Sequence, residues 1–173
     1  MNAEELKHYI RDIPDFPKPG VLFRDVTPLL LEPRALQAAA DLAAEPFRAL
    51  GIERVLGVES RGFLLGAPVA LALEAGLVLV RKEGKLPYKT HQVSYDLEYG
   101  NDTVEMHVDS VEVGQRVLIL DDLIATGGTA GAAVRLAQEA GGKVVGCAFL
   151  IELTALGGVA KLGVDRVHSV LRY

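Results

Sequence analysis

Cysteine is scarce in this sequence, which contains only Cys147 among its 173 residues. One thiol forms neither an internal disulfide nor a cysteine-based zinc site, so a disulfide-stabilised secreted scaffold and a cysteine zinc centre are excluded. Long apolar runs are also missing, because stretches such as 77–80 and 117–120 are far shorter than the roughly 20 residues that cross a bilayer. The N-terminus lacks the basic region and the apolar run of a signal peptide. We therefore expect a cytoplasmic protein that does not enter the membrane.

The sequence also lacks an excess of basic residues. The chain has 18 Lys and Arg residues against 23 Asp and Glu residues, which gives a formal net charge of −5. Nucleic-acid-binding domains usually carry a basic surface, so we expect no nucleic-acid partner, although this charge is compatible with a local phosphate site. Half of the residues are hydrophobic, and the length is that of one domain that buries about 70% of its unfolded surface. We expect residues 1–173 to form a single domain.

Short apolar segments rich in Val, Ile and Leu alternate with longer stretches of helical character. The apolar segments are 54–58, 77–81, 116–121 and 143–151. Continuous apolar runs indicate strands that are covered on both faces, and their alternation with helices indicates a parallel α/β sheet. Helices are predicted over 34–50, 62–75 and 128–140. Pro46 is expected to bend the first of these helices or to end it early.

Two regions depart from this alternation. Residues 13–33 contain five of the eight prolines, so an irregular segment is predicted there rather than a helix. Residues 84–107 show no helical period, but they alternate around Val104, Met106 and Val108. We expect a long loop with a hairpin in this second region, and long loops in compact domains are often functional.

The clearest functional signal is the segment 117–130, VLILDDLIATGGTA. A buried strand is expected to end with Asp121 and Asp122, and a short loop then leads through two glycines flanked by threonines into a helix. Such glycines let several N–H groups point at one anion, and the helix adds its positive end. The residues predicted to bind a phosphate monoester are Ala125, Thr126, Gly127, Gly128 and Thr129. The alternative, that the carboxylates only cap a turn and the glycines only end a strand, explains less of the pattern.

This segment closely resembles the phosphoribosyl pyrophosphate motif of the type I phosphoribosyltransferases. Further segments resemble the adenine phosphoribosyltransferase family: FPKPGVLFRDVTP at 16–28, GVESRGF at 57–63 with RKEGKLP at 81–87, and SYDLEYG at 94–100. The resemblance extends from about residue 10 to the C-terminus. It implies the type I phosphoribosyltransferase fold, a central, mostly parallel sheet flanked by helices with a flexible hood.

The activity that this resemblance implies is transfer of the 5-phosphoribosyl group from phosphoribosyl pyrophosphate to N9 of adenine. The products are AMP and pyrophosphate, and the reaction belongs to purine salvage. It also implies a Mg²⁺ ion held mainly by substrate oxygens, with no dedicated protein metal ligands, and a homodimer. Because the reaction is substitution at an anomeric carbon, an oxocarbenium-like transition state is expected.

The resemblance assigns pyrophosphate to two groups of residues. The first is the loop of Glu59, Ser60, Arg61 and Gly62, in which the family commonly has a cis non-proline peptide. The second is Arg81, Lys82 and Lys85, which lie in a local excess of positive charge. Asp121 and Asp122 are expected to bind the two ribose hydroxyls and to favour the positive charge of the transition state. Together with Glu98, the residues Arg61, Asp121 and Asp122 are the predicted catalytic set.

Adenine is assigned to residues 13–33, the predicted base-binding segment. Main-chain groups of Leu22, Phe23 and Arg24 would read the edge of the base, and the Phe23 ring would stack on it. Residues 84–107 would be the hood that closes over the site and excludes water. In the hood, Glu98 would handle the N7 proton of the purine and Tyr99 would lie beside it, although a solvated glutamate remains the alternative for Glu98.

Two other functions remain open from the sequence. One is phosphoribosyl transfer to another base, such as guanine, xanthine or orotate, because base choice depends on a few hydrogen bonds. The other is a regulatory protein that senses phosphoribosyl pyrophosphate and binds nucleic acid. Such a regulator is expected to carry an added DNA-binding domain or a basic face, and a chain of 173 residues with a charge of −5 fits neither.

Overall fold

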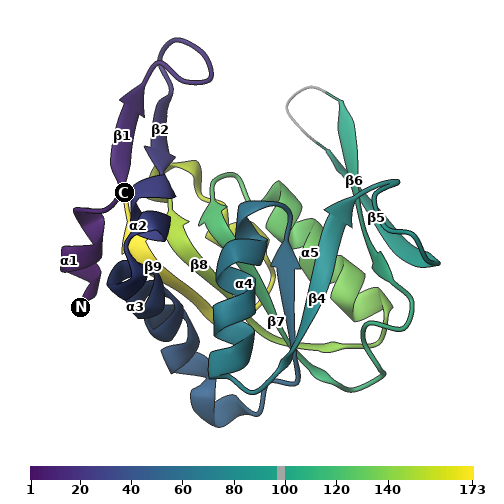
Figure 1. The fold of residues 1–173 in the computed structure, drawn as a ribbon. Helices are drawn as coiled ribbons and strands as arrows, with labels where there is room; N and C mark the ends of the chain where they lie inside the picture. Colours follow the sequence, from purple (N-terminus) through teal and green to yellow (C-terminus); the bar gives the residue numbers. More distant parts are fainter. Residues whose placement is uncertain (97–99) are drawn as a thin grey trace.

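The computed structural model describes residues 1–96 and 100–173, and its framework is a seven-stranded sheet with helices on both faces (Figure 1). The strands lie in the order β5-β6-β4-β3-β7-β8-β9, and all neighbouring pairs are parallel except β5 with β6 and β6 with β4. Their bounds are β3 Arg54–Val58, β4 Gly76–Lys82, β5 Thr90–Asp96, β6 Asn101–His107, β7 Arg116–Ile124, β8 Lys143–Glu152 and β9 Val167–Arg172. The predicted α/β fold with a mostly parallel sheet is confirmed.

The central strands form where the sequence has continuous apolar runs. Residues 117–120 of β7 are all at most 1% exposed, because α5 covers one face of the sheet while α3 and α4 cover the other. Alternate side chains of β7 therefore enter two separate apolar cores, with Ile119 under α5 and Leu118 and Leu120 under α3 and α4. The last strand, β9, was not predicted, because His168 and Ser169 interrupt its apolar pattern.

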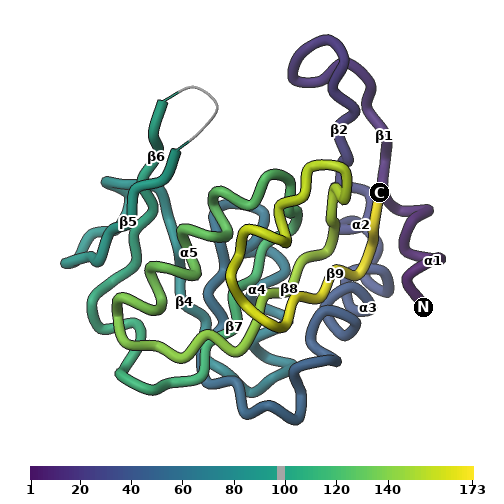
Figure 2. The backbone as a smooth tube through the Cα atoms, turned by 180° about the vertical axis from the view of Figure 1, so that it is seen from behind, coloured from purple at the N-terminus to yellow at the C-terminus, as the bar shows by residue number. Residues whose placement is uncertain are grey.

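Three of the helices, α3, α4 and α5, lie close to their predicted positions, whereas α1 and α2 were not predicted. Their bounds are α1 Ala3–Lys7, α2 Thr27–Leu31, α3 Pro33–Ala44, α4 Arg61–Ala72 and α5 Gly128–Glu139, with 3₁₀ turns η1 Glu45–Leu50, η2 Thr154–Leu156 and η3 Val159–Lys161. As expected from Pro46, the α-helix predicted over 34–50 stops at Ala44 and continues as η1. Figure 2 shows from behind that α5 lies over one face of the sheet, in which β9 is the strand next to β8. Among the described residues, no helix combines the length and the apolar character needed to cross a bilayer.

The expectation that residues 13–33 are irregular was wrong. This region contributes to a separate antiparallel hairpin of β1 Arg11–Pro14 and β2 Leu22–Asp25, followed by α2. The prolines do not prevent these elements, because Pro14 ends an edge strand and Pro28 lies in the first turn of α2, where no intrahelical N–H is needed. We call β1 and β2 the N-terminal hairpin; it projects above the sheet in Figure 1.

The hairpin expected within residues 84–107 is present and consists of β5 and β6, which follow a loop at residues 84–89. Strands β5 and β6 pair over their full length, and β6 also pairs with the end of β4 through Arg81 and Lys82. The hairpin is regular because Val93, Val104 and Met106 are buried against the core under α5. The predicted site residues Glu98 and Tyr99 lie outside the described residues. We call β5 and β6 the second hairpin.

Candidate active site

The connection from β7 to α5 forms one wall of a cleft of about 1160 Å³. Gly127 precedes α5 with a φ of 82°, a left-handed conformation that favours glycine, and a Cβ atom there would lie 2.5 Å from the carbonyl oxygen of Gly158. The first N–H groups of α5 have no intrahelical acceptors and can bind an anion. All the predicted phosphate-binding residues line this cleft: Ala125, Thr126, Gly127, Gly128 and Thr129. We call them the phosphate loop.

The two adjacent carboxylates lie within β7, which corrects the expectation that the strand ends with them. The strand continues to Ile124 because Leu123 and Ile124 still pair with β8. Asp121 lines the cleft, whereas Asp122 is 6% exposed and accepts a hydrogen bond from Nε of Arg61 at 2.5 Å. Burial and the negative charge of Asp122 raise the pKa of Asp121 well above its ordinary value. The pair therefore offers one carboxyl group to the cleft and one to Arg61.

Arg61 begins α4 immediately after a tight turn from β3. The Glu59–Ser60 peptide in this turn is cis. Gly62 allows the close approach of α4 to β7, because a Cβ atom there would lie 2.8 Å from Oδ1 of Asp121 and 3.2 Å from its Cα. This approach brings the start of α4 against β7, where the Arg61 side chain reaches Asp122.

Arg81, Lys82 and Lys85, which we call the basic cluster, surround the carboxylate of Glu59. Nε of Arg81 donates to Glu59 Oε2 at 3.2 Å and the N–H of Lys82 does so at 2.9 Å, while Lys85 Nζ forms an ion pair with Oε1. Burial raises the pKa of Glu59, but hydrogen bonds from Lys85, Lys82 and Arg81 lower it more, so it lies below its ordinary value. Glu59 thus holds the cluster together by accepting from all three of its members.

Glu105 is a buried carboxylate that sequence analysis missed. It is 2% exposed, and its Oε1 accepts from the N–H groups of Lys85 at 3.1 Å and Leu86 at 3.0 Å. Its Oε2 accepts from Thr90 Oγ1 at 3.2 Å and Gln92 Nε2 at 3.1 Å. Burial raises the pKa of Glu105, but these hydrogen bonds leave it below the ordinary value. Glu105 therefore orders the loop that carries Lys85, and no local motif identifies it.

The predicted base-binding residues lie in β2. The Phe23 ring packs edge-on against Phe16, with centroids 5.2 Å apart, and the guanidinium carbon of Arg61 lies 5.4 Å from the centroid of Phe23. Arg24 is used differently, because its side chain forms an ion pair with Asp12 and lies over the ring of Tyr173 at 4.1 Å. The aromatic surface of Phe23 thus adjoins Arg61, while the charge of Arg24 is paired with Asp12 within the hairpin.

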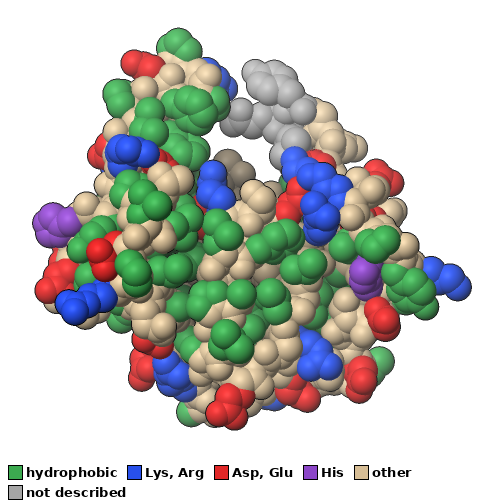
Figure 3. All heavy atoms as spheres, viewed as in Figure 1, with side chains coloured by type: hydrophobic (Ala, Val, Ile, Leu, Met, Phe, Trp, Pro, Cys, Tyr) green, Lys and Arg blue, Asp and Glu red, His purple; other side chains and the backbone are tan. Residues whose placement is uncertain are grey.

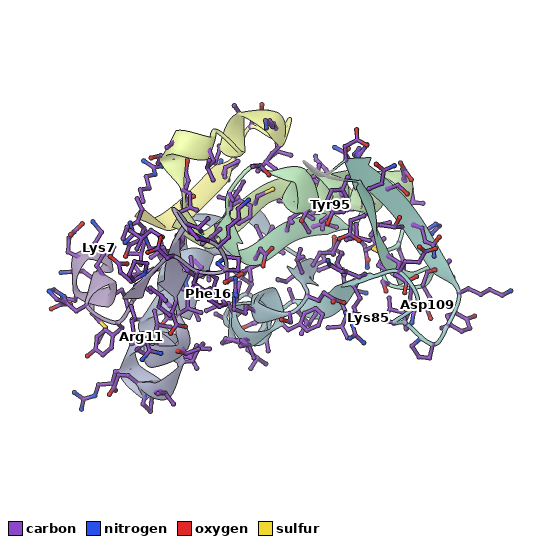
Figure 4. The ribbon with its side chains drawn as sticks, turned by 90° about the horizontal axis from the view of Figure 1, so that it is seen from above. Lys7, Arg11, Phe16, Lys85, Tyr95 and Asp109 are labelled. Carbon is purple, nitrogen blue, oxygen red and sulfur yellow. The ribbon has the colours of Figure 1, made fainter. Side chains whose placement is uncertain are left out.

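The two hairpins lie on opposite sides of the site at the carboxyl ends of the parallel strands. In Figure 4, seen from above, Phe16 lies on the N-terminal side, whereas Lys85 and Tyr95 lie on the side of the second hairpin. Figure 3 shows the N-terminal hairpin projecting at the top of the molecule. Tyr95, another residue that the sequence analysis did not select, lines the cleft beside the phosphate loop. The arrangement can hold a ligand with an anionic group at each end and a flat group beside Phe23.

Comparison with known proteins gives a consistent result. The sequence matches the phosphoribosyl transferase domain over residues 26–168. It is 54% identical to an adenine phosphoribosyltransferase of Rhodopirellula baltica, over 98% of this chain and 82% of that protein. The structure resembles the crystal structure of adenine phosphoribosyltransferase from Rhodothermus marinus, with a TM-score of 0.94 and 56% identity, over 99% of this chain and 98% of the other. The Saccharomyces cerevisiae enzyme, complexed with an imino-altritol bisphosphate and adenine, gives a TM-score of 0.93 at 39% identity, over 98% of each chain.

Proposed function

Because the chain belongs to the adenine phosphoribosyltransferase family, we propose how its residues carry out the reaction of that family. The enzyme transfers the 5-phosphoribosyl group from phosphoribosyl pyrophosphate to N9 of adenine and releases pyrophosphate. The product is AMP, so the reaction is a pentosyl transfer in purine salvage. One observation carries the assignment of roles: the phosphate loop, Asp121, Arg61 and the basic cluster follow the same edge of the sheet. We take residues 1–173 to act as one domain.

The phosphate loop binds the 5′-phosphate of the substrate. Gly127 and the start of α5 supply N–H groups and the positive end of a helix, while Thr126 and Thr129 add hydroxyl donors. This site needs no lysine, because a phosphate dianion accepts hydrogen bonds readily from oriented N–H groups. The loop therefore anchors the ribose end of the substrate.

Pyrophosphate is bound by Arg61 and the basic cluster. Its departure leaves positive charge on the ribose ring and carries negative charge away, so fixed cations lower the barrier by stabilising the leaving group. Glu59 keeps the cluster assembled before the substrate arrives, which reduces the entropy lost on binding. Ser60 and Gly62 contribute the turn that presents Arg61.

Asp121 and Asp122 act on the ribose. Asp121 lines the cleft and would accept from a ribose hydroxyl, whereas Asp122 is engaged by Arg61. The negative charge that this pair carries favours the oxocarbenium-like transition state at the anomeric carbon. The ion pair from Arg61 to Asp122 also links the group proposed to bind the leaving pyrophosphate to the residue next to Asp121, which faces the reacting sugar.

Adenine binds beside Phe23. Its main-chain neighbours Leu22 and Arg24 supply donors and acceptors for the edge of the base, and the Phe23 ring supplies a stacking surface. Support comes from the position of Phe23 next to Arg61, which brings the base site close to the pyrophosphate site. We further propose that Glu98 moves the N7 proton and that Tyr99 lies beside it in the hood.

We propose Mg²⁺ as the metal of the reaction. Among the described residues, no group of three or more His, Cys, Asp or Glu side chains gathers as a metal cage. The oxygen-rich donors that line the cleft, Asp121 above all, suit a hard cation that arrives on the substrate and keeps waters. When bound, the ion would neutralise charge on pyrophosphate and so assist its departure.

A homodimer is the proposed assembly. Leu64 and Leu71 of α4 and Leu77 and Leu79 of β4 are between 37% and 81% exposed. Figure 3 shows hydrophobic side chains spread over the face of the molecule on which α4 and β4 lie. Exposed apolar patches of this kind often mark protein interfaces, and an identical patch on a second copy matches it by symmetry. Leu71→Glu should therefore shift the chain toward the monomer in sedimentation velocity. A cytoplasmic location is proposed with it, consistent with the buried, unpaired Cys147.

A steady-state assay tests the function and its base specificity. The purified enzyme is given Mg²⁺ and phosphoribosyl pyrophosphate with adenine, hypoxanthine, guanine or orotate in parallel, and nucleotide and pyrophosphate are measured. We expect AMP from adenine and far lower turnover of the other bases. Preferred use of guanine or orotate would reassign the base, and no nucleotide from any base would overturn the function.

A further inference from the structure

Four side chains from four elements form a continuous chain between the basic cluster and the phosphate loop. Lys82 Nζ on β4 pairs with Oδ2 of Asp102 on β6 at 2.8 Å. The Tyr95 hydroxyl on β5 lies 3.3 Å from the same Asp102 oxygen and 3.1 Å from Thr129 Oγ1 on α5. Resting on the proposed function, we propose that Tyr95 and Asp102 are positioning residues that connect the pyrophosphate end of the substrate site with its 5′-phosphate end.

Packing fixes the position of the Tyr95 hydroxyl. The side chain is 7% exposed, and its ring lies against the phosphate loop, with Cδ2 3.4 Å from where a Cβ atom of Gly128 would be. Arg135 Nη2 on α5 donates to the carbonyl oxygen of Ser94 at 3.0 Å, which ties the same strand to the same helix. The hydroxyl is therefore held between Asp102 and Thr129 by the fold around it.

The number of hydroxyl protons in this hydrogen-bonded series of side chains determines how the series responds to phosphate. The Tyr95 hydroxyl has one proton, and both Asp102 and Thr129 lie within its reach. A phosphate dianion offers only acceptors, so it takes the hydroxyl proton of Thr129, and Thr129 Oγ1 must then accept from Tyr95. Phosphate binding thus turns the Tyr95 proton toward the phosphate loop and away from Asp102.

Asp102 stays satisfied when that proton turns away. Its carboxylate still accepts from Lys82 Nζ at 2.8 Å and from the N–H of Thr103 at 2.9 Å. The hydrogen bond from Lys82 is the largest influence on the pKa of Asp102, which lies below its ordinary value. An ammonium has three N–H groups, so Lys82 keeps two for pyrophosphate while Asp102 orients it. Asp102 therefore holds Lys82 in position, and because it keeps other donors, it allows the Tyr95 hydroxyl to donate to Thr129 instead.

A purely structural role for Tyr95 predicts a different behaviour. If the ring and hydroxyl only fix the second hairpin to α5, their loss should lower thermal stability and affect all ligands alike. A positioning role predicts that removing the hydroxyl alone weakens both ends of phosphoribosyl pyrophosphate and leaves adenine untouched. It also predicts that Asp102, which lies on the side of Lys82, influences binding at the phosphate loop.

The test combines kinetics with calorimetry on the full chain. KM for each substrate is measured for the wild type, Tyr95→Phe, Asp102→Asn and the double variant, and ribose 5-phosphate and inorganic pyrophosphate are titrated separately as probes of the two ends. Tyr88→Phe is the matched control, because Tyr88 lies just before β5 and is 56% exposed. We expect each single variant to raise KM for phosphoribosyl pyrophosphate about three- to tenfold, the size of one hydrogen bond, with KM for adenine unchanged. The double variant should lose no more than the larger single effect.

Several results would overturn the connection. If Tyr95→Phe matches Tyr88→Phe in every constant, or if the two losses multiply in the double variant, Tyr95 and Asp102 act separately. If Tyr95→Phe does not fold, Asp102→Asn decides, because unchanged ribose 5-phosphate binding in that variant contradicts the proposal. Calorimetry needs no turnover, so failure of the wild type to form AMP would remove the proposed function and leave these titrations as an independent result.

Discussion

The two hairpins above the carboxyl ends of the strands are attached to the protein in different ways. Strands β1 and β2 have four residues each and form a sheet of their own, which is held at its base by Arg11 pairing with Asp25 at 2.6 Å. Strands β5 and β6 have seven residues each, and β6 continues the central sheet through β4. The tip of the first hairpin is consequently open, with Phe16 50% and Leu22 46% exposed, whereas Val104 and Met106 of the second are buried.

This difference matches the chemistry that each hairpin is proposed to handle. An open apolar and aromatic surface suits a flat, neutral base, because stacking needs area and few fixed charges. A charged substrate needs cations at fixed positions, and the second hairpin helps to fix Lys85, because the buried Glu105 of β6 accepts from the N–H of Lys85. Under the proposed function, the two substrates would be recognised by separate structural elements, which adjoin at Arg61.

The largest effect is expected from removing that shared group. Arg61→Ala should lower kcat/KM about a hundredfold or more, because a fixed cation at the leaving group is lost. Asp122→Asn, which changes the partner of Arg61, should lower turnover in the same direction. Steady-state kinetics and thermal unfolding are compared, with Arg48→Ala as a control at a surface ion pair away from the cleft. Unfolding of both variants at the assay temperature would show that Arg61 and Asp122 are structural.

A smaller effect, confined to one of the two substrates, is expected from changing Glu105. Its two oxygens accept from four donors, so Glu105→Gln places an NH₂ group against two of them. The cost should be about 1–3 kcal/mol in unfolding free energy, with weaker binding of pyrophosphate and an unchanged KM for adenine. Denaturant unfolding and pyrophosphate titration measure this, with the exposed Glu112→Gln as control. Equal losses for both substrates would contradict a role confined to the second hairpin.

The opposite one-sided effect is expected at Phe23. Phe23→Ala removes the stacking surface, so KM for adenine should rise about five- to tenfold, the size of one aromatic contact. Pyrophosphate titration should give the wild-type affinity. Phe23→Tyr keeps the ring and serves as the matched variant, which should stay close to the wild type. An unchanged KM for adenine in Phe23→Ala would place the base elsewhere.

The smallest effect is a difference between the hairpins in acid. Glu59, Asp102 and Glu105 on the second side and Asp25 on the first all have pKa values below their ordinary values. Such carboxylates stabilise the fold above their unfolded pKa, and this stabilisation is lost as the pH falls through the folded pKa. Between about pH 5 and pH 3, amide hydrogen exchange should therefore rise more in 81–107 than in 11–27. Equal increases in the two regions would mean that these carboxylates stabilise residues 81–107 no more than residues 11–27.

Much of the fold was predictable from sequence, because central strands buried on both faces must be continuously apolar. Strand β3 was predicted with its exact bounds, and β7 differed only by continuing beyond Asp121. The N-terminal hairpin and α2 were not predicted, since Pro14 and Pro28 are strong signals against regular structure when their edge-strand and first-turn positions are unknown. Strand β9 was missed because its polar residues resemble a loop.

The site was predictable only where its residues are contiguous. The phosphate loop forms one unbroken segment, and it lies in the cleft as expected. Glu105 escaped notice because a charged residue between Val104 and Met106 normally faces solvent, and its partners are 13 to 20 residues away. Tyr95 and Asp102 acquire their contacts only when β5, β6 and α5 pack together. The roles of Glu98 and Tyr99 stay predictions, because both lie outside the described residues.

The most direct test of separate recognition is the kinetic behaviour of the double variant Phe23→Ala/Glu105→Gln. Both Michaelis constants are measured alongside the two single variants under the same conditions. Independent supports predict that KM for adenine equals that of Phe23→Ala and KM for phosphoribosyl pyrophosphate equals that of Glu105→Gln, since distant sites act additively. If each single variant instead raises both constants, or if the double variant departs from these values, the two hairpins do not divide the substrates between them.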